Sequence, residues 1–256
     1  MTTADSLLLR HDHDGVVTLT LNRPAQFNAL STELLAALQA ALDQVGADPT
    51  ARVVVIAGAG KAFCAGHDLK QMRANHDQAY MQALFKQCGR VMTAITELPQ
   101  PVIARVHGIA TAAGCQLVAS CDLAVAADVA KFAVSGINVG LFCSTPAVAL
   151  SRNLGRKQAL EMLLTGEFID APEAQRRGLV NRVCPADDLD AEVGRLAASI
   201  CAKSQTAVRM GKQLFYRQLE MGMAAAYQLA GETMACNMMS ADAVAGIDNF
   251  MNKRKA

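Results

Sequence analysis

The sequence predicts an α/β fold in which a parallel sheet forms early in the chain and helices dominate its end. The first observation is an alternation of apolar, strand-like runs, such as Val53–Ile56, with segments whose apolar residues recur at helical spacing. The second is that the pattern becomes mostly helical from Ala147 onward. The third is that no low-complexity linker divides the 256 residues, a length that corresponds to one or two domains.

The chain begins with a predicted strand and a predicted helix. Residues 15–21 are rich in β-branched side chains and predict a strand, which Asn22-Arg23-Pro24 ends. Ser31 is a suitable N-cap for the helix that follows, because its hydroxyl can accept a hydrogen bond from a free backbone amide. The apolar positions of this helix recur at helical spacing: Leu34, Leu35, Leu38, Leu42 and Val45.

The next elements repeat this alternation. Residues 52–57 form a continuous apolar run, typical of a strand buried on both faces, and a glycine-rich loop follows at 58–66. A second amphipathic helix carries apolar residues at Met81, Leu84, Phe85, Cys88, Met92 and Ile95. We expect further strands at 102–106, 123–127, 131–134 and 179–184, and a short apolar helix that starts near Gly114.

Composition excludes several classes of protein. Only 18% of the residues are charged and 52% are hydrophobic, which excludes intrinsic disorder and indicates that apolar surface is hidden in an oligomer. A net charge of +1 and an aromatic content of 4% provide neither an electrostatic attraction to nucleic acid or membranes nor a base-stacking platform. No apolar stretch reaches the roughly 20 residues of a membrane span. Eight cysteines without a C-x-x-C pair fit a reducing compartment, so we expect a cytoplasmic protein.

A glycine-rich segment and a His/Asp segment do not match the known motifs for phosphate and metal binding. Gly58-Ala59-Gly60-Lys61 lacks the spacing of a phosphate loop, and Phe63 occupies the third glycine position of a dinucleotide fingerprint. His11-Asp12-His13-Asp14 precedes the first expected strand, and we interpret it as solvated polar residues. We therefore expect no metal site.

Two strand-to-helix junctions share the same pattern, in which small residues lie between a strand and the start of a helix. Val53–Ile56 leads into residues 61–70, and Val102–Val106 leads into residues 107–117. Small residues let the backbone come close to a ligand at both places, and a helix N-terminus offers unpaired N–H groups. Two such amides aimed at one point form an oxyanion hole. The alternative is that the small residues only allow tight packing, and spacing alone leaves both interpretations open.

The residue types in these segments, and their order, resemble those of one known family. Leu21-Asn22-Arg23-Pro24-Ala25-Gln26-Phe27-Asn28-Ala29-Leu30, then Ala62-Phe63-Cys64-Ala65-Gly66-His67-Asp68-Leu69-Lys70, then His107-Gly108 through Cys121-Asp122-Leu123 resemble the crotonase (enoyl-CoA hydratase/isomerase) family. The resemblance runs from about Leu7 to Lys253. It implies a crotonase-like spiral of ββα units that carries a CoA groove over residues 1–200. A helical trimerisation region follows over residues 201–256.

The same resemblance implies partners and site residues. The ligand would be a coenzyme A thioester that serves as substrate, with no further cofactor, and the assembly a homotrimer or a dimer of trimers. The backbone N–H groups of His67 and Ala113 would form the oxyanion hole. Ala113 replaces a glycine common in the family, so the hole requires that Ala113 adopt suitable backbone angles. The residues matched to CoA binding are Ala25, Gln26, Phe27, Ala65, Lys70, Lys212 and Phe215.

Two departures from the family pattern affect the reaction that we expect. Hydratases of the family use two glutamates, and this chain has Gln116 and Gly136 at those positions. Glutamine binds water but cannot take its proton near neutral pH, so efficient hydration is not expected. The first hypothesis is still an enoyl-CoA hydratase-like lyase of fatty acid metabolism. One alternative is a decarboxylase, since a decarboxylase of the family has the same sequence as Gly66-His67-Asp68. Another is an acyl-CoA-binding protein without turnover.

We expect the other polar side chains of these motifs to have structural roles. We expect Asp68 to cap a helix and Asp122 to form structural hydrogen bonds. For His67 the backbone amide is favoured over proton transfer by the imidazole. Cys115 and Cys143 are expected near the pocket, although no cysteine–histidine pairing indicates a nucleophile.

Overall fold

The computed structural model describes residues 6–253, which form two sheets and a set of surrounding helices. The strands are β1 (Leu8–His13), β2 (Val16–Leu21), β3 (Val53–Gly58), β4 (Ala62–Cys64), β5 (Val102–Val106), β6 (Ile109–Thr111), β7 (Leu123–Ala127), β8 (Lys131–Ala133), β9 (Ile169–Asp170) and β10 (Arg182–Cys184). The helices are α1 (Thr32–Ala47), α2 (Leu69–Ala74), α3 (Gln78–Glu97), α4 (Ala113–Ser120), α5 (Ser144–Asn153), α6 (Arg156–Thr165), α7 (Ala171–Arg177), α8 (Leu189–Cys201), α9 (Gln205–Leu219), α10 (Met223–Met238) and α11 (Ala241–Lys253). Short 3₁₀ helices occupy Pro24–Gln26, Ser135–Val139 and Ala186–Asp188.

The larger sheet has the strand order β1-β2-β3-β5-β7-β10. Strands β2, β3, β5, β7 and β10 pair in parallel, and only β1 runs antiparallel to its neighbour β2. Every residue from Val53 to Ala57 is buried, because this central strand has layers of structure on both faces. The sheet is the parallel α/β core that the sequence predicts.

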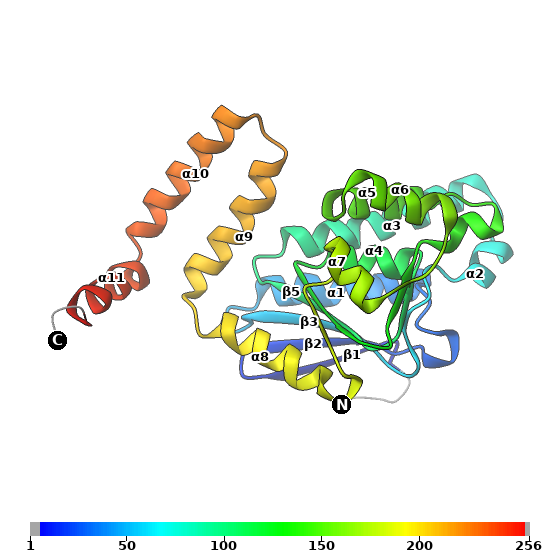
Figure 1. The fold of residues 1–256 in the computed structure, drawn as a ribbon, viewed down its shortest axis with the longest axis horizontal. Coiled ribbons are helices and arrows are strands. Elements are labelled where there is room, and N and C mark those ends of the chain that lie inside the picture. Colours follow the sequence, from blue (N-terminus) through cyan, green and yellow to red (C-terminus); the bar gives the residue numbers. More distant parts are fainter. Residues whose placement is uncertain (1–5, 254–256) are drawn as a thin grey trace.

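The smaller sheet has the order β4-β6-β8-β9 and shows how the chain spirals. In each of the pairs β3–β4, β5–β6 and β7–β8, the first strand joins the larger sheet and the second joins the smaller one. A helical segment follows each pair before the chain returns to the larger sheet, as the ribbon shows (Figure 1). The repeating unit is therefore a ββα turn, which confirms the predicted spiral.

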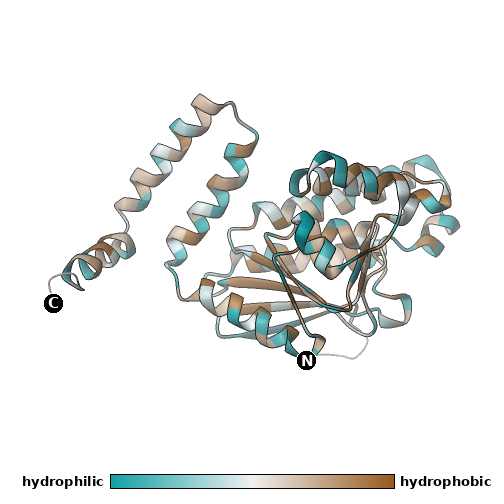
Figure 2. Ribbon diagram, in the orientation of Figure 1, coloured by the Kyte–Doolittle hydropathy of each residue, from teal (hydrophilic) through white to brown (hydrophobic). Residues whose placement is uncertain are grey.

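Helices cover both faces of the larger sheet. The main hydrophobic core contains the buried faces of α1, α3 and α4 together with the inner sides of both sheets. A second cluster forms where α8 packs Leu189, Val193 and Leu196 against Val53 and Val125 on the opposite face. Figure 1 shows α8 on that face, and Figure 2 shows that the sheet strands carry the most hydrophobic residues.

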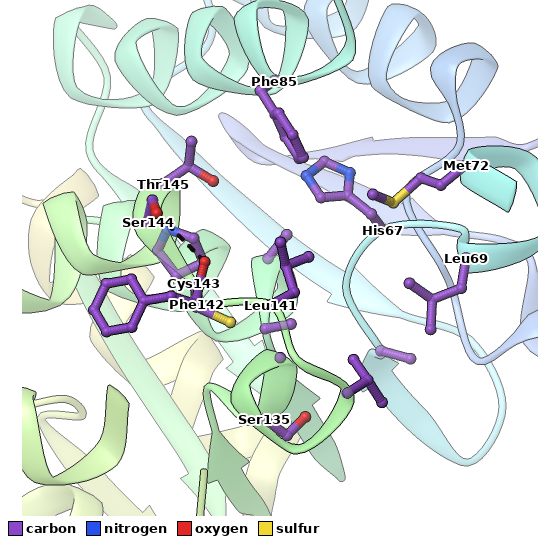
Figure 3. A pocket seen from close by; sticks show the side chains of 16 residues that line it. His67, Leu69, Met72, Phe85, Ser135, Leu141, Phe142, Cys143, Ser144 and Thr145 are labelled. Atoms are coloured by element: carbon purple, nitrogen blue, oxygen red, sulfur yellow. Dashed lines mark hydrogen bonds between the residues drawn. The ribbon is translucent and has the colours of Figure 1, made fainter. Parts of the chain in front are cut away.

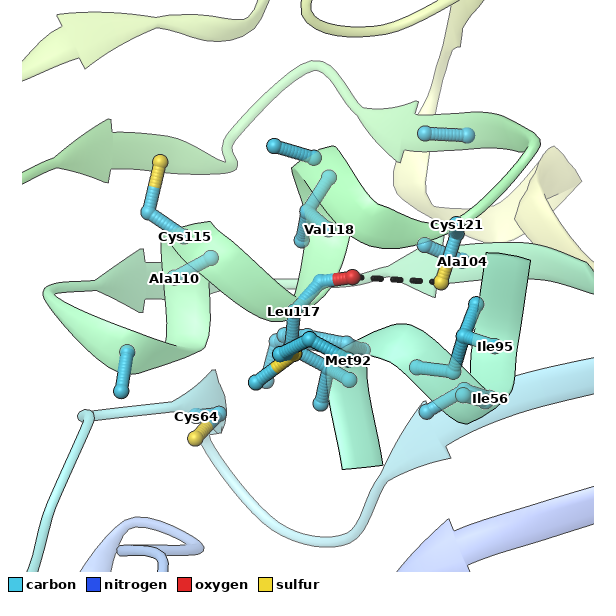
Figure 4. Packing of buried hydrophobic residues seen from close by; sticks show 14 of the residues in the cluster. Ile56, Cys64, Met92, Ile95, Ala104, Ala110, Cys115, Leu117, Val118 and Cys121 are labelled. Carbon is cyan, nitrogen blue, oxygen red and sulfur yellow. Dashed lines mark hydrogen bonds between the residues drawn. The ribbon is translucent and has the colours of Figure 1, made fainter. Parts of the chain in front are cut away.

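Helix α4 lies at the centre of the main core. All eight of its residues are buried, although it contains polar and small side chains as well as apolar ones. Leu117 packs among Met92 and Ile95 of α3, and the Cys121 thiol donates to the Leu117 carbonyl over 3.2 Å (Figure 4). Since its surroundings fix this helix from all sides, its first turn is held in place relative to both sheets.

Helices α9–α11 extend away from the rest of the subunit (Figure 1). We call them the C-terminal arm. Helix α10 has no buried residue, yet it carries Met223, Tyr227 and Met234, each about 70% exposed. The proposed boundary at residue 200 falls in the last turn of α8. Within residues 6–253, no helix combines the length and apolar character that crossing a membrane requires.

Some short elements differ from the sequence prediction. The chain forms β1 at Leu8–His13, a strand that the sequence analysis did not predict, although residues 11–14 are exposed as expected. Its charged side chains fit an exposed sheet edge, where they discourage pairing with other chains. The predicted glycine-rich loop contains β4, a strand of three residues. Strand β10 covers only Arg182–Cys184 of the predicted 179–184.

Candidate active site

The two strand-to-helix junctions meet side by side. Strand β4 pairs in parallel with β6, with Ala62 opposite Ile109 and Cys64 opposite Ala110. Parallel pairing makes both strands end at the same edge of the smaller sheet. Helices α2 and α4 begin shortly after these strand ends, so the fold places the two predicted amide segments next to each other.

Two glycines allow this close approach. Gly66 has a φ of +91°, and a Cβ atom built on it would lie 2.8 Å from the Ala112 Cβ and 3.1 Å from the Ala113 nitrogen. A Cβ atom on Gly114 would lie 2.1 Å from the Cys64 carbonyl oxygen. Both contacts are closer than a real side chain tolerates. The small residues of the junctions therefore bring one backbone segment against the other.

The predicted oxyanion amides lie at this contact. Among residues 6–253, no protein acceptor is found for the N–H of His67 or of Ala113, whereas the amide of Ala112 donates to the Ala133 carbonyl over 3.0 Å. Ala113 is the first residue of α4 and has an ordinary negative φ. Ala112 instead adopts φ 50° and ψ −120°, a region that favours glycine. The sequence analysis placed the unusual backbone demand on Ala113; the structure places it one residue earlier.

A pocket of about 220 Å³ opens beside these amides (Figure 3). Most of its lining is apolar, and the lining residues include no aspartate, glutamate, lysine or arginine. The full lining is Ala65, His67, Leu69, Met72, Phe85, Ala112, Ala113, Ser135, Gly136, Val139, Leu141, Phe142, Cys143, Ser144, Thr145 and Pro146. Such a lining suits an acyl chain with a few polar contacts.

The imidazole of His67 is the most unusual side chain of the pocket. Its ring meets the Phe85 ring edge to face, with centroids 5.5 Å apart (Figure 3). Both ring nitrogens are buried, and neither has a hydrogen-bond partner within the described part of the chain. Burial lowers the pKa of His67 below its ordinary value, and the nearby Leu30 backbone only partly opposes this effect.

Asp68 has the structural role that the sequence predicts. Its carboxylate caps α2 by accepting from the amides of Lys70 and Gln71, each over 3.1 Å, and it forms an ion pair with Arg23 at 2.9 Å. Burial acts to raise the pKa of Asp68, but the hydrogen bond and charge of Arg23 together with the amides of Gln71 and Lys70 outweigh burial and lower it. The side chain of Lys70 is exposed at the start of α2. The Asp68 carboxylate therefore has a structural role, as the cap of α2 and the partner of Arg23.

The two positions matched to the family glutamates differ from each other. Gln116 is buried in α4 outside the pocket lining, and its Oε1 has no partner among the described residues. Gly136 lines the pocket, and a Cβ atom on it would lie 2.6 Å from the Leu141 carbonyl oxygen and 2.7 Å from the Cys143 sulfur. The backbone that follows has thus closed over the space that a side chain at position 136 would need.

The residues matched to the CoA groove fall into two groups. Ala25, Gln26 and Phe27 form an exposed turn, and the Ala65 amide donates to the Phe27 carbonyl over 3.0 Å, so this turn lies next to the pocket. Phe215 lies on the C-terminal arm, where it is 56% exposed, and is not part of the pocket lining. The structure thus brings the first group, but not Phe215, to the candidate site.

The position of Lys212 differs from the CoA-binding role that the sequence analysis expected. Its ammonium donates to the carbonyls of Ile95 and Gln100 over 2.8 and 2.9 Å and pairs with the Asp122 carboxylate at 2.6 Å. Tyr216 donates to the same carboxylate over 2.8 Å. Because these partners hold the ammonium in a buried position, we replace its assignment to a nucleotide by the anchoring of α9 to the core. The structural role expected for Asp122 is confirmed.

Sequence reasoning found only part of the pocket. Cys143 lines it, while Cys115 is buried outside the lining. Burial raises the pKa of both thiols, which disfavours their use as nucleophiles. The contributions of Phe85 and Ser135 were missed. Phe85 was grouped with the apolar face of its helix, and no pattern distinguishes a pocket residue from a core residue on such a face.

Comparison with known proteins gives a consistent result. The enoyl-CoA hydratase/isomerase family model matches residues 11–256. The chain is 46% identical over 248 residues to enoyl-CoA hydratase domain-containing protein 3, mitochondrial, from Xenopus laevis, covering 97% of this chain and 84% of that protein. The human protein of the same name is 45% identical over 242 residues, covering 94% of this chain and 80% of its own. The run Gly140-Leu141-Phe142-Cys143-Ser144-Thr145-Pro146 also resembles this branch of the family, in agreement with these relatives.

Solved structures agree with the sequence comparison. An enoyl-CoA hydratase structure from Mycobacterium smegmatis has a TM-score of 0.96 at 60% identity, covering 97% of each chain. The crystal structure of human enoyl-CoA hydratase domain-containing protein 3 has a TM-score of 0.94 at 43% identity, covering 97% of this chain and 98% of that one. The vertebrate relatives are named mitochondrial, so the comparisons do not support the cytoplasmic expectation. Sequence and fold together show that the chain belongs to the enoyl-CoA hydratase/isomerase, or crotonase, family.

Proposed function

We propose that this protein binds an acyl-CoA thioester, with the thioester oxygen between the backbone N–H groups of His67 and Ala113. The observation that carries the proposal is the contact between the two junctions, where neither of these amides has an acceptor in the described chain. The acyl group would enter the apolar pocket of about 220 Å³. CoA would run past Ala65 and the turn at residues 25–27, with Lys70 facing its phosphates. No cofactor is needed for this function.

The chemistry that follows is stabilisation of a thioester enolate. When a thioester loses a group from its α-carbon, negative charge develops on the carbonyl oxygen. Two fixed amides in a pocket with little water lower the energy of that charge, and the loss of one such donor costs roughly 10²–10³ in rate. The start of α4 adds the favourable end of a helix dipole at Ala113. The amides thus stabilise the enolate more than the neutral thioester.

Carboxylate-assisted hydration does not fit the described pocket. Hydration needs a group that takes a proton from water, and no carboxylate lines the pocket. Gln116 has an amide and Gly136 has no side chain at the positions of the family glutamates. We therefore infer a hydratase-like lyase that uses the enolate chemistry of its family with a different acid/base set.

Decarboxylation of a malonyl-type thioester is the second candidate. Its carbon–carbon bond breaks to release CO₂ and leaves the electron pair in the enolate, so no general base is required. The observation that favours it is a pocket with two free amides and no carboxylate side chain among its described lining. A third outcome, binding without turnover, would leave the same groove as an acyl-CoA sensor.

The test is a panel of acyl-CoA esters with matched chains. We expect crotonyl-, butyryl-, malonyl- and 3-hydroxybutyryl-CoA to raise the thermal unfolding midpoint, with products followed by mass spectrometry. A crystal structure with butyryl-CoA should place the thioester oxygen about 3 Å from both amide nitrogens. Rapid crotonyl-CoA hydration would contradict the altered acid/base set. A thioester oxygen far from either amide would overturn the proposed function.

The C-terminal arm leads us to propose a homotrimer or a dimer of trimers. The arm exposes many large apolar side chains, among them Met223, Tyr227, Met234, Met239 and Phe250. Helix α10 buries none of its residues within the described subunit, and an isolated helix of this length is marginal in water. Light scattering coupled to gel filtration should therefore give a mass of three or six subunits.

A further inference from the structure

We propose that the His67 imidazole is the base that exchanges protons with the α-carbon of the bound acyl group. This inference rests on the proposed acyl-CoA function and names the acid/base group that the family pattern leaves missing. It concerns the side chain of His67, whereas the oxyanion hole uses only its backbone amide. The two roles can therefore be separated by changing the side chain.

The geometry places the ring beside the expected reacting carbon. The imidazole lines the same pocket as the amides of its own residue and of Ala113. In a thioester the α-carbon is bonded to the carbonyl carbon, so an oxygen held at the two amides puts the α-carbon next to the pocket wall that His67 forms. The ring extends into the pocket between Phe85 and Met72 (Figure 3).

The ring nitrogens are available for chemistry. Neither Nδ1 nor Nε2 has a partner at normal hydrogen-bond geometry among the described residues, although both are buried and the Leu30 backbone lies near the ring. A buried polar atom without a partner destabilises the folded state, so an arrangement of this kind is expected at functional sites. A bound substrate can supply the missing partner. Contact with the Phe85 edge fixes the ring plane without using a nitrogen.

Other polar side chains nearby are poor candidates for this role. Asp68, the next residue in the chain, is occupied by Arg23 and by two amides of α2. The hydroxyl of Ser135 pairs with Thr111 over 2.9 Å, and a serine hydroxyl is not basic near neutral pH. Burial raises the pKa of the Cys143 thiol, so its thiolate is scarce. Of the described lining side chains, only the His67 imidazole is both neutral at pH 7 and able to act as a proton acceptor.

The proposed step is a reversible proton transfer. The α-carbon–hydrogen bond breaks, and the proton moves to an unprotonated imidazole nitrogen. The electron pair forms a carbon–carbon double bond as the carbonyl oxygen takes the negative charge, which the amides of His67 and Ala113 stabilise. Reversal restores the thioester. When the imidazolium exchanges its proton with water before reversal, the α-carbon acquires a solvent hydrogen, and no oxidant or other reactant is consumed.

The protonation state of the ring agrees with this role. Because burial lowers the pKa of His67 below 6.5, the neutral form that can accept a proton predominates at pH 7. The acceptor is therefore ready without prior deprotonation. The pocket around the ring is lined by apolar or neutral side chains, among them Phe85 from α3, Met72 and Leu69 from α2, and Ser144 and Thr145 from α5. The backbone of Leu30 also lies close enough to act on the ring.

The test is deuterium exchange into butyryl-CoA, a saturated ester that cannot be hydrated or decarboxylated. The intact full-length protein is incubated with the ester in D₂O, and mass spectrometry follows the gain of one and then two mass units. His67→Gln and His67→Phe retain the backbone amide and remove the base. We expect each to slow exchange by roughly 10²–10⁴-fold. His76→Gln, which makes the same kind of change at an exposed histidine outside the pocket lining, is the matched control and should leave the exchange rate unchanged.

Two further readouts separate a base from a structural histidine. The wild-type exchange rate should level off above the lowered imidazole pKa, whereas the residual rate of His67→Gln should keep rising with deuteroxide. His67→Ala should open space beside the amides, and added imidazole should restore part of its exchange. A purely structural role of the ring would produce neither the plateau nor the rescue.

The outcomes distinguish the inference from the function on which it rests. Tight binding of butyryl-CoA without exchange by the wild type would overturn the role of His67 and leave the binding function intact. Equal exchange by wild type and by folded His67→Gln and His67→Phe would overturn it as well. Failure of all esters to bind would overturn the proposed function and, with it, this inference. Thermal unfolding of each variant verifies that it is folded.

Discussion

Replacing Ala112 by glycine is expected to stabilise the protein, although glycine usually destabilises. Ala112 has φ 50° and ψ −120°, a conformation that side chains rarely adopt. It immediately precedes α4 and orients the first amide of that helix, the N–H of Ala113. The strain at this position is therefore tied to the direction of a proposed oxyanion donor. Glycine adopts the same backbone angles without a steric penalty.

The magnitude follows from three opposing contributions. Relief of the backbone strain contributes about 2 kcal/mol, within the range of about 1–3 for such conformations. The greater freedom of glycine in the unfolded chain costs about 0.7 kcal/mol. Loss of the Ala112 methyl group, which is partly buried against the core, costs about 0.4 kcal/mol, half of a buried methylene. The net gain is about 1 kcal/mol, which corresponds to a rise of about 2–4 °C in the unfolding midpoint.

The assay is thermal unfolding at fixed protein concentration, with Ala113→Gly as the matched control. Ala113 is a helical residue with a negative φ, so glycine there should lower stability by about 0.5–1 kcal/mol. The two neighbouring alanines should therefore respond with opposite signs. If Ala112→Gly lowers the midpoint as much as Ala113→Gly does, the assignment of strain to Ala112 is refuted.

Three further predictions concern the missing carboxylates, the arm anchor and acid stability. The double substitution Gln116→Glu and Gly136→Glu should not create crotonyl-CoA hydration, because a side chain at position 136 meets backbone within 2.6 Å; hydration at rates like those of family hydratases would disprove this. Asp122→Ala leaves the Lys212 ammonium buried without its carboxylate and should cost about 3–5 kcal/mol in chemical denaturation, whereas a loss below about 1 kcal/mol would argue against the anchor. Hydrogen bonding by Ser31 lowers the pKa of Glu33 to about 2, so its contribution to stability is present above pH 4.5 and is lost as the pH falls toward 2. Glu33→Gln should flatten that part of the stability profile in acid titrations, and an unchanged slope would contradict it.

Elements with a strong local signal could be predicted from the sequence. The strands at 102–106 and 123–127 are observed with those bounds, since short, mostly apolar runs mark strands that are largely buried. Ser31 caps α1, as expected, by accepting from the Leu34 amide. Strands β4 and β6 have three residues each, too few for a periodic pattern to emerge. Their position depends on pairing with each other rather than on their own composition.

In the candidate site too, features with a local sequence signal could be predicted, and features that depend on the tertiary fold could not. The junction motifs predicted that a helix follows each of the two strands, because short-range residue types determine where a helix starts. The role of Lys212 could not be predicted, since its partner Asp122 lies 90 residues away and only the tertiary fold brings the two together. The strain at Ala112 also escaped prediction, because alanine carries no signal for a positive φ. Long-range charge pairing and backbone strain are properties of the fold.

The closed space around Gly136 has an evolutionary consequence. A carboxylate could return to this position only after the segment at residues 137–143 had moved, because the Leu141 carbonyl and the Cys143 sulfur occupy the path of a side chain. A lineage that began with a single substitution at position 136 would therefore pass through a poorly packed intermediate. Change in the opposite order, with the loop first, would alter the pocket wall that Leu141 and Cys143 form. A carboxylate at position 136 therefore requires coordinated change of the residue and of the loop.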